Sequence, residues 1–145
     1  MEKQKEISSR CMDVIPKHIG VLARIKKFAI NSADGTYDYE TGEIVNLETG
    51  YMVTFHQNDE NGNAYGRYTD EEYDLLTQKV FDEIGADKIY IGVYNSVSEV
   101  SFCCKSKDKA KMIMHTYNQE SIWDNSRKVP IINLKYDKRK NPINH

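Results

Sequence analysis

Two short segments carry polar side chains that could together form a binding site. Glu99 and Ser101 are two positions apart in an alternating run, and Gln119 and Ser121 follow a helical segment. Residues two apart on a strand share one face of the sheet, so these groups converge if their strands pair, with Trp123 close by. One hypothesis is a recognition site for a small molecule or a nucleotide. The alternative is a buried network in which the polar groups only satisfy one another.

A long polar connection extends this candidate site. Residues 57–68 are rich in asparagine and glycine, and connections of this length are uncommon unless they have a role. In a strand-helix-strand unit such a connection lies above the carboxyl end of the strand, where ligands commonly bind. The candidate binding residues therefore also include the end of that strand and the connection itself: Thr54, His56, Tyr65, Arg67 and Tyr68.

Signatures of catalysis and of metal binding are absent from the sequence. Nucleophilic catalysis needs a nucleophile, a base and a group that orients the base, but there is no Gly-x-Ser-x-Gly elbow and the four histidines are far apart. Glycines 62 and 66 do not form a phosphate-binding loop, because no Gly-Lys-Ser/Thr follows. The three cysteines, two of them adjacent at 103 and 104, lack the spacing of zinc ligands. We expect no catalytic residue, metal or cofactor, and favour a protein that is not an enzyme.

Composition and charge argue against two classes of partner, nucleic acids and membranes. The 145 residues carry a formal charge of −2, which argues against a protein that mainly binds nucleic-acid backbones. The lysine clusters at 105–111 and 135–140 are interpreted as solvated surfaces. No apolar stretch approaches the length of a membrane span, and the first seven residues lack the apolar core of a signal peptide. The sequence predicts a cytoplasmic protein that binds no membrane, and its charge disfavours nucleic acid as a partner.

Two amphipathic helices are predicted to position the site. The first covers residues 70–84, since Thr69 and Glu72 form a capping box before it and Gly85 suits the left-handed position that ends a helix. The second covers residues 106–117, with a serine as its N-cap and apolar residues on one side.

Alternating strands surround these helices. We predict strands over residues 50–56, 88–94 and 99–104, with a short one at 121–123 after the second helix. The order strand-helix-strand-strand-helix-strand predicts an α+β fold of the βαββαβ, ferredoxin-like (split βαβ) type. A further strand at 129–136 either closes the sheet or pairs with a second copy, which would give a homodimer.

The remaining segments are predicted to extend one domain. Residues 1–49 would form an N-terminal helix and a β-hairpin extension, with the helix over 1–15 and the hairpin over 36–47. The pattern between 19 and 30 fits either a strand or a short helix. Residues 50–136 would be the βαββαβ core, and residues 137–145 a basic tail.

Part of the core resembles a known family. The segments Glu99-Val-Ser-Phe102, Ala110 and Asn118-Gln119-Glu-Ser-Ile122 resemble a family of small uncharacterised α/β domains from bacteria and their phages. That family has a Glu-x-Ser-Phe strand, an amphipathic helix and a Gln-x-Ala/Ser-Ile strand start. The resemblance covers residues 50–124. It implies the fold and a phage or bacterial context, but no activity.

These observations lead to three functional hypotheses. The first is a non-enzymatic binding protein, such as a phage-encoded inhibitor of a host defence system acting in the host cytosol, with some of the ten tyrosines as interface anchors. Its partner would be a host protein or a small signalling ligand. The second is a small-molecule or nucleotide-binding, signal-sequestering protein. The third is an RNA-binding module, because βαββαβ is also the order of the RNA-recognition motif, although the aromatic and basic run of that motif is missing.

Overall fold

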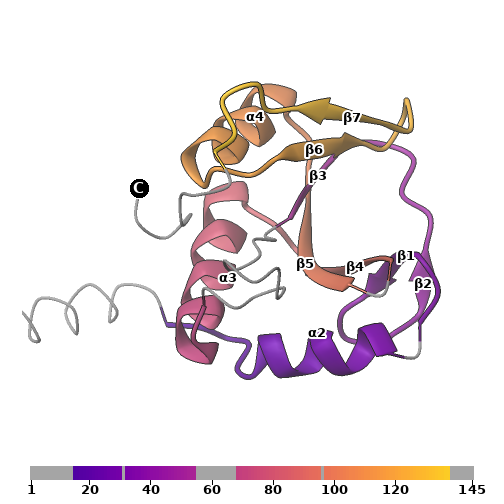
Figure 1. Ribbon diagram of the computed structural model, residues 1–145, viewed down its shortest axis with the longest axis vertical. Coiled ribbons are helices and arrows are strands. Elements are labelled where there is room, and N and C mark those ends of the chain that lie inside the picture. Colours follow the sequence, from indigo (N-terminus) through magenta and orange to yellow (C-terminus); the bar gives the residue numbers. More distant parts are fainter. Residues whose placement is uncertain (1–14, 31, 55–67, 96, 138–145) are drawn as a thin grey trace, which may run out of the picture.

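The structure, a computed structural model, describes residues 15–30, 32–54, 68–95 and 97–137. Within these residues, three helices and seven strands follow one another (Figure 1). In chain order they are α2 (Val21–Ile30), β1 (Gly35–Asp38), β2 (Ile44–Val45), β3 (Tyr51–Thr54), α3 (Asp70–Ile84), β4 (Tyr90–Tyr94), β5 (Val97–Cys104), α4 (Lys107–Thr116), β6 (Ser121–Asp124) and β7 (Val129–Ile132).

All seven strands belong to one antiparallel sheet, in the order β2-β1-β4-β5-β3-β6-β7. The predicted ferredoxin-like βαββαβ fold is therefore wrong. The hairpin expected as an N-terminal extension instead pairs with the edge of β4, and β7 pairs with β6. Each added strand satisfies backbone groups that would be unpaired at the edge of a four-stranded sheet.

The two predicted helices are confirmed, with their ends fixed by the expected side chains. The Glu72 amide donates to Thr69 Oγ1 at 3.1 Å, and the Thr69 amide donates to Glu72 Oε1 at 3.0 Å. Gly85 ends α3 at a φ of 69°, which only glycine adopts at little cost. At the start of α4, Ser106 accepts from the Lys109 amide at 3.2 Å.

The segment that fitted either a strand or a helix forms α2. Its first amides, those of Gly20 and Val21, donate to the carboxylate of Asp74 on α3, each at 3.1 Å. Further along, the hydroxyl of Ser98 on β5 donates to the Ile25 carbonyl. These bonds attach α2 to both α3 and the sheet.

The hydrophobic core lies between the helices and one face of the sheet, here called the outer face. Figure 1 shows the three helices distributed along this face. Side chains of Val53, Ile91, Val100 and Phe102 point into it and are fully buried, and Tyr73 of α3 is the largest fully buried side chain among the described residues. The centre of the outer face is thus sealed from water, whereas Ile44 and Val129 at its two ends are exposed.

Three further sequence predictions concern the ends of the chain and the membrane. The helix predicted over residues 1–15 lies almost wholly outside the described residues, as does the basic tail. Among the described helices, none has the length and apolar character needed to cross a membrane.

Candidate binding site on the inner face of the sheet

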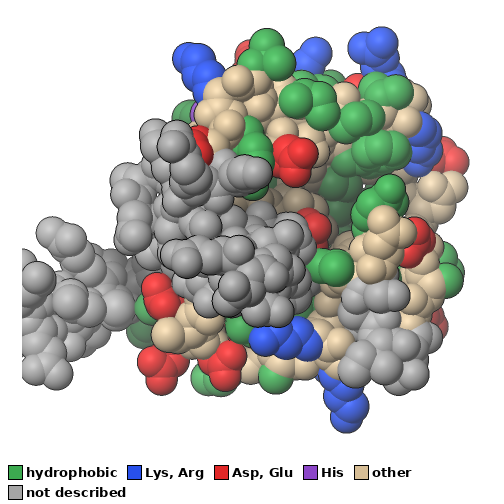
Figure 2. Space-filling model, in the orientation of Figure 1, with side chains coloured by type: hydrophobic (Ala, Val, Ile, Leu, Met, Phe, Trp, Pro, Cys, Tyr) green, Lys and Arg blue, Asp and Glu red, His purple; other side chains and the backbone are tan. Residues whose placement is uncertain are grey.

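The face of the sheet turned away from the helices, here called the inner face, carries the polar groups singled out in the sequence. Strand register determines which residues share it, because alternate residues of each strand point to the same side. Figure 2 shows a recess in this side of the molecule, below the hydrophobic side chains over β6 and β7. The central residues of the inner face are Met52, Thr54, Tyr90, Gly92, Glu99, Ser101, Cys103, Ser121, Trp123, Pro130 and Ile132.

A row of hydroxyl groups crosses the middle of the inner face. Tyr90 lies opposite Ser101, and Ser101 lies opposite Thr54. Continuing the register of β3 and β6 places Ser121 opposite Thr54. Strands are about 4.8 Å apart, so the row extends over roughly 15 Å. Within the described part of the chain, none of these four side chains makes a hydrogen bond, although Ser101 is only 2% exposed. Thr54, Tyr90 and Ser121 are only partly buried, so their hydroxyls can form hydrogen bonds with a ligand or with water.

A glycine makes room for the most buried hydroxyl of this row. Gly92 pairs with Glu99 and lies diagonally next to Ser101. A Cβ atom at position 92 would lie 3.0 Å from Ser101 Oγ, closer than nearly all real Cβ contacts. The φ of Gly92 is not in the positive range, so its backbone conformation does not require glycine. The missing side chain therefore leaves the space that the Ser101 hydroxyl occupies.

An apolar row runs alongside the hydroxyl row. Cys103 lies opposite Met52, Met52 opposite Trp123, and Trp123 opposite Pro130. Met52 is buried, whereas the Trp123 indole is 41% exposed. Exposed aromatic rings are frequent contact points for ligands, because they offer a large rigid surface. The inner face thus combines a flat apolar strip with a parallel line of neutral donors and acceptors.

The strands contribute no lysine or arginine to the inner face among the described residues. The ammonium group of Lys88, which acts on Tyr90 of this face, is paired with Asp38 Oδ2 at 3.0 Å. The hydrogen bond from Lys88 and those from the amides of Thr41 and Glu40 lower the pKa of the Asp38 carboxyl below its ordinary value. Burial raises the pKa of the Tyr90 phenol, so Tyr90 stays neutral at physiological pH. The central part of the site is therefore unsuited to a phosphate or another anion.

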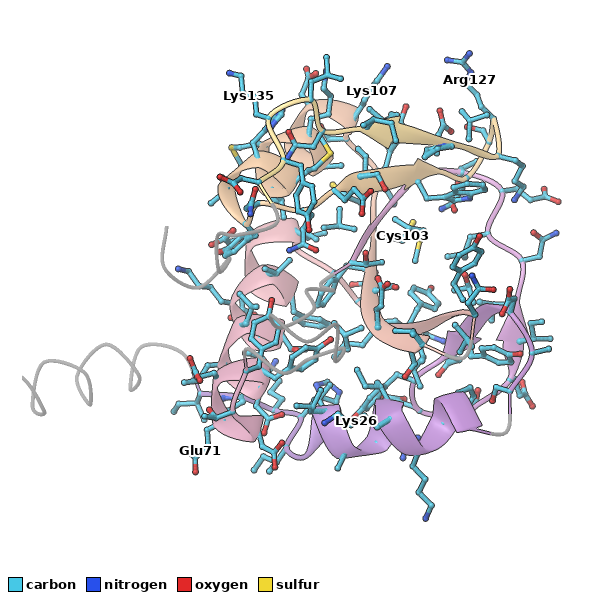
Figure 3. The ribbon with its side chains drawn as sticks, in the orientation of Figure 1. Lys26, Glu71, Cys103, Lys107, Arg127 and Lys135 are labelled. Carbon is cyan, nitrogen blue, oxygen red and sulfur yellow. The ribbon has the colours of Figure 1, made fainter. Side chains whose placement is uncertain are left out.

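The surroundings of Cys103 favour its protonated thiol form. Figure 3 shows it in the space between β5 and the connection from β2 to β3. Its Sγ lies 3.7 Å from the Thr49 carbonyl oxygen and 3.8 Å from Asn125 Nδ2. Burial raises the pKa of Cys103, which disfavours the thiolate that a nucleophile requires. Glu99, four positions away on the same strand, is roughly 13 Å distant and cannot act as its base.

Neither the inner face nor the rest of the described chain offers a metal site. No group of three or more histidine, cysteine, aspartate or glutamate side chains is arranged to hold an ion within the described residues.

Most of the predicted polar group is brought together, with one exception. Thr54, Glu99, Ser101, Ser121 and Trp123 all lie on the inner face. Gln119 does not: it is 3% exposed, its Nε2 donates to the Tyr117 carbonyl at 2.9 Å, and its own carbonyl accepts from Asn133 Nδ2 at 2.8 Å. Gln119 therefore belongs to a structural network that joins the end of α4 to the segment after β7.

The connection predicted to be part of the site lies largely outside the described residues. His56, Tyr65 and Arg67 fall there, so their part in binding stays a prediction. Tyr68 is described and is 8% exposed, with its ring edge-on to Tyr73 at 5.3 Å. It packs in the core and does not serve as a surface anchor in this conformation.

Sequence reasoning did not include Tyr90, Gly92, Met52 or Cys103 among the candidate residues. The alternating pattern that placed Glu99 and Ser101 on one face also places these residues there once the strand partners are known. The alternating pattern is visible in the sequence, but it identifies the neighbours of Ser101 on the sheet only when the pairing of the strands is known.

Comparison with protein-family models, with curated proteins and with solved structures finds no match. The resemblance to the bacterial and phage domain family stays a prediction.

Proposed function

We propose that this protein is a non-enzymatic binding protein whose ligand docks on the inner face of the sheet. The observation that carries the proposal is the row of hydroxyls on β4, β5, β3 and β6 without hydrogen-bond partners in the described chain. A protein gains little stability from leaving such groups unused, whereas a ligand that hydrogen-bonds them gains both affinity and specificity.

The ligand class follows from the chemistry of the two rows. Hydroxyls both donate and accept, and the strands add no cation to this face among the described residues. The apolar row with Trp123 favours a ligand with a flat face. A neutral, hydroxyl-rich or amide-rich small molecule, such as a nucleoside or a sugar, satisfies both conditions. Phosphorylated forms of the same molecule should bind less well, because the strands provide no cationic side chain for the phosphate on this face among the described residues.

A ligand titration tests this proposal. Thermal-shift measurements with nucleosides and with mono- and disaccharides should show stabilisation by at least one of them, because a ligand that binds only the folded state raises its stability by mass action. The Ser101→Ala variant should bind the same ligand with an apparent affinity at least about fivefold lower, because one hydrogen bond to the ligand is lost. Thr116→Ala, which removes an exposed hydroxyl at the end of α4, is the matched control. No response to any uncharged compound would contradict the proposal.

A protein partner is the second candidate. The observation that favours it is the exposed apolar surface at and after the edge strand β7, where Ile132 is 55% and Leu134 94% exposed. A strand from a partner, or from a second copy in a homodimer, could add to this edge. Sedimentation of the purified protein over a range of concentrations shows whether the partner is a second copy, because only a homodimer forms in the absence of another protein. An Ile132→Asp variant should lose the association, and an unchanged dimer would exclude this edge.

The proposal places the protein in the cytoplasm, because Cys103 and Cys104 are free thiols and stable disulfides are typical of secreted proteins. That its target belongs to a host defence system, in a cell infected by a phage, stays a prediction from the sequence.

A further inference from the structure

A second surface with different chemistry lies at the start of α2, away from the inner face. Here the segment before the helix, the first two turns of α2 and Tyr39 enclose an open depression of about 580 Å³. Its lining consists of Lys17, His18, Ile19, Gly20, Ala23, Arg24, Lys27 and Tyr39. We propose that this depression is an anion site that binds a phosphate monoester of a small organic molecule.

The lining has three cationic side chains and no acidic one. Ala23, Arg24 and Lys27 recur at helical spacing on α2, and Lys17 approaches from the preceding segment. Lys17, Arg24 and Lys27 form no ion pair in the described part of the chain. Three unpaired cations around one depression repel one another, and an anion between them removes that repulsion.

Arg24 is already held in a binding position. Its Nε donates to the Tyr39 carbonyl at 3.2 Å, and its Nη2 shares the same acceptor. The guanidinium carbon lies 4.7 Å from the centre of the Tyr39 ring. No hydrogen bond involves Nη1 within the described residues, so this group keeps its donors for a ligand. A fixed guanidinium loses little side-chain entropy when it binds an oxyanion.

The His18 ring forms part of the lining and fixes one wall of the depression. It lies edge-on to Tyr39, with 5.4 Å between the ring centres. Its Nδ1 has no hydrogen-bond partner among the described residues, but this atom is buried and does not face the depression. His18 therefore contributes shape to the depression, and the cationic side chains contribute the binding groups.

The backbone around the depression is fixed by α3. The Lys17 amide donates to Gln78 Oε1 at 3.0 Å, and the amides of Gly20 and Val21 donate to Asp74. Because the Asp74 carboxylate already occupies the first amides of α2, the helix terminus itself is not the anion receptor. The proposed ligand is bound by side chains.

The size and the apolar part of the lining determine the ligand class. A volume of about 580 Å³ is within the range of small-molecule sites and far exceeds a phosphate ion. Ile19, which is 82% exposed, and Ala23 offer apolar contact beside the cations. A phosphate group bound by Lys17, Arg24 and Lys27, with an organic group against Ile19, uses both features. An acidic peptide is the competing occupant.

Titrations with phenyl phosphate, phenol and a hexaglutamate peptide test the proposal. Calorimetry should show saturable binding of phenyl phosphate, and NMR should show shifts of the Gly20, Ala23 and Arg24 amides. Phenol should not bind. The Lys17→Gln/Lys27→Gln variant should weaken binding by about tenfold or more, since two charge-assisted contacts are lost. Lys105→Gln/Lys107→Gln, with two exposed lysines at the start of α4, is the matched control and should bind as the wild type does.

Three results would overturn the anion site: no saturable binding of phenyl phosphate, equal affinity in the Lys17→Gln/Lys27→Gln variant, or tighter binding of the hexaglutamate peptide. Both lysines are exposed, so the variant should fold normally, which a thermal melt checks. The Ser101→Ala variant should bind phenyl phosphate unchanged, because the inner face is a separate site.

Discussion

The two faces of the sheet are built from alternate residues of the same strands, yet they have opposite roles. On β5, Val100 and Phe102 enter the outer face and are fully buried against helices. Between and beyond them, Ser101 and Cys103 enter the inner face, where Ser101 has no hydrogen-bond partner in the described chain. The centre of the outer face is covered by packing against the helices, whereas the inner face has hydroxyl groups that are available to a ligand.

This difference indicates where stability and binding reside. Burial of apolar side chains is the main source of folding free energy, and the outer face has nearly all of it. Groups held ready for a ligand contribute little to stability, and functional sites commonly have this property. Substitutions on the two faces should therefore separate cleanly into effects on folding and effects on binding.

The largest effect is expected on the outer face. Phe102→Ala should lower the free energy of unfolding by about 3–5 kcal/mol, because a fully buried aromatic ring is replaced by a cavity. Thr54→Ala, on the neighbouring strand but on the inner face, should change it by less than about 1 kcal/mol. Urea unfolding followed by circular dichroism measures both. Similar losses in the two variants would break the distinction between the faces.

The second-largest loss of stability is expected where α2 is attached to α3. Asp74→Ala removes a carboxylate that accepts from the amides of Gly20 and Val21, and should cost about 2–3 kcal/mol, as expected for hydrogen bonds to a charged group. Hydrogen exchange of the first amides of α2 should become faster in the variant. If exchange were unchanged, Asp74 would not be what fixes α2 to α3.

A smaller effect on stability is expected at Gly92 on the inner face. Gly92→Ala should lower the free energy of unfolding by about 1 kcal/mol, because the new methyl group would lie 3.0 Å from Ser101 Oγ and the hydroxyl has to move. Binding of an uncharged ligand should weaken as well, since the Ser101 hydroxyl is one of the groups proposed to contact it. A destabilised variant with normal binding would show that Gly92 is needed for folding alone.

The smallest effect concerns two carboxyl groups, one on each face. Amide and hydroxyl donors from Arg127 and Ser126 lower the pKa of Asp124, and the Lys88 hydrogen bond lowers that of Asp38. Both groups bind protons more readily in the unfolded state, so their stabilisation is present above pH 3.8 and is lost as the pH falls through the folded pKa values.

Urea unfolding between pH 6 and pH 2 tests this. Asp124→Asn and Asp38→Asn should each reduce the acid-induced loss of stability, whereas Asp87→Asn, at an exposed position, is the comparison. A pH dependence equal to that of the wild type in both variants would contradict the assignment.

Local features of the fold could be predicted from the sequence because they depend on neighbouring residues. Thr69, Glu72 and Gly85 delimit α3 through contacts within one turn, and alternation at 99–104 assigns the two faces. The pairing of β1 with β4 depends on residues far apart in the chain, and no local pattern encodes it. The fold prediction was wrong for this reason.

The candidate site was predicted only in part, because the position of Gln119 depends on a local turn that the sequence pattern does not indicate. Gln119 was grouped with Ser121 on the assumption that both lie on one strand. Asn118 instead adopts a positive φ of 49°, and β6 begins only at Ser121. The chain therefore turns before the strand, and Gln119 points into a different network. A single left-handed residue, which sequence patterns seldom identify, changed the outcome.

The position of β3 has a consequence for how the protein folds. Without this four-residue strand, the sheet would divide into β2-β1-β4-β5 and the β6–β7 hairpin, and both partners of β3 are distant in sequence. Hairpins close in microseconds, but strand pairings across long loops are slow because the loop entropy is lost first. We expect β3 to join late, as the step that unites two preformed halves. In stopped-flow experiments Val53→Ala should then accelerate unfolding and leave the folding rate nearly unchanged. A slower folding rate would instead place β3 in the nucleus.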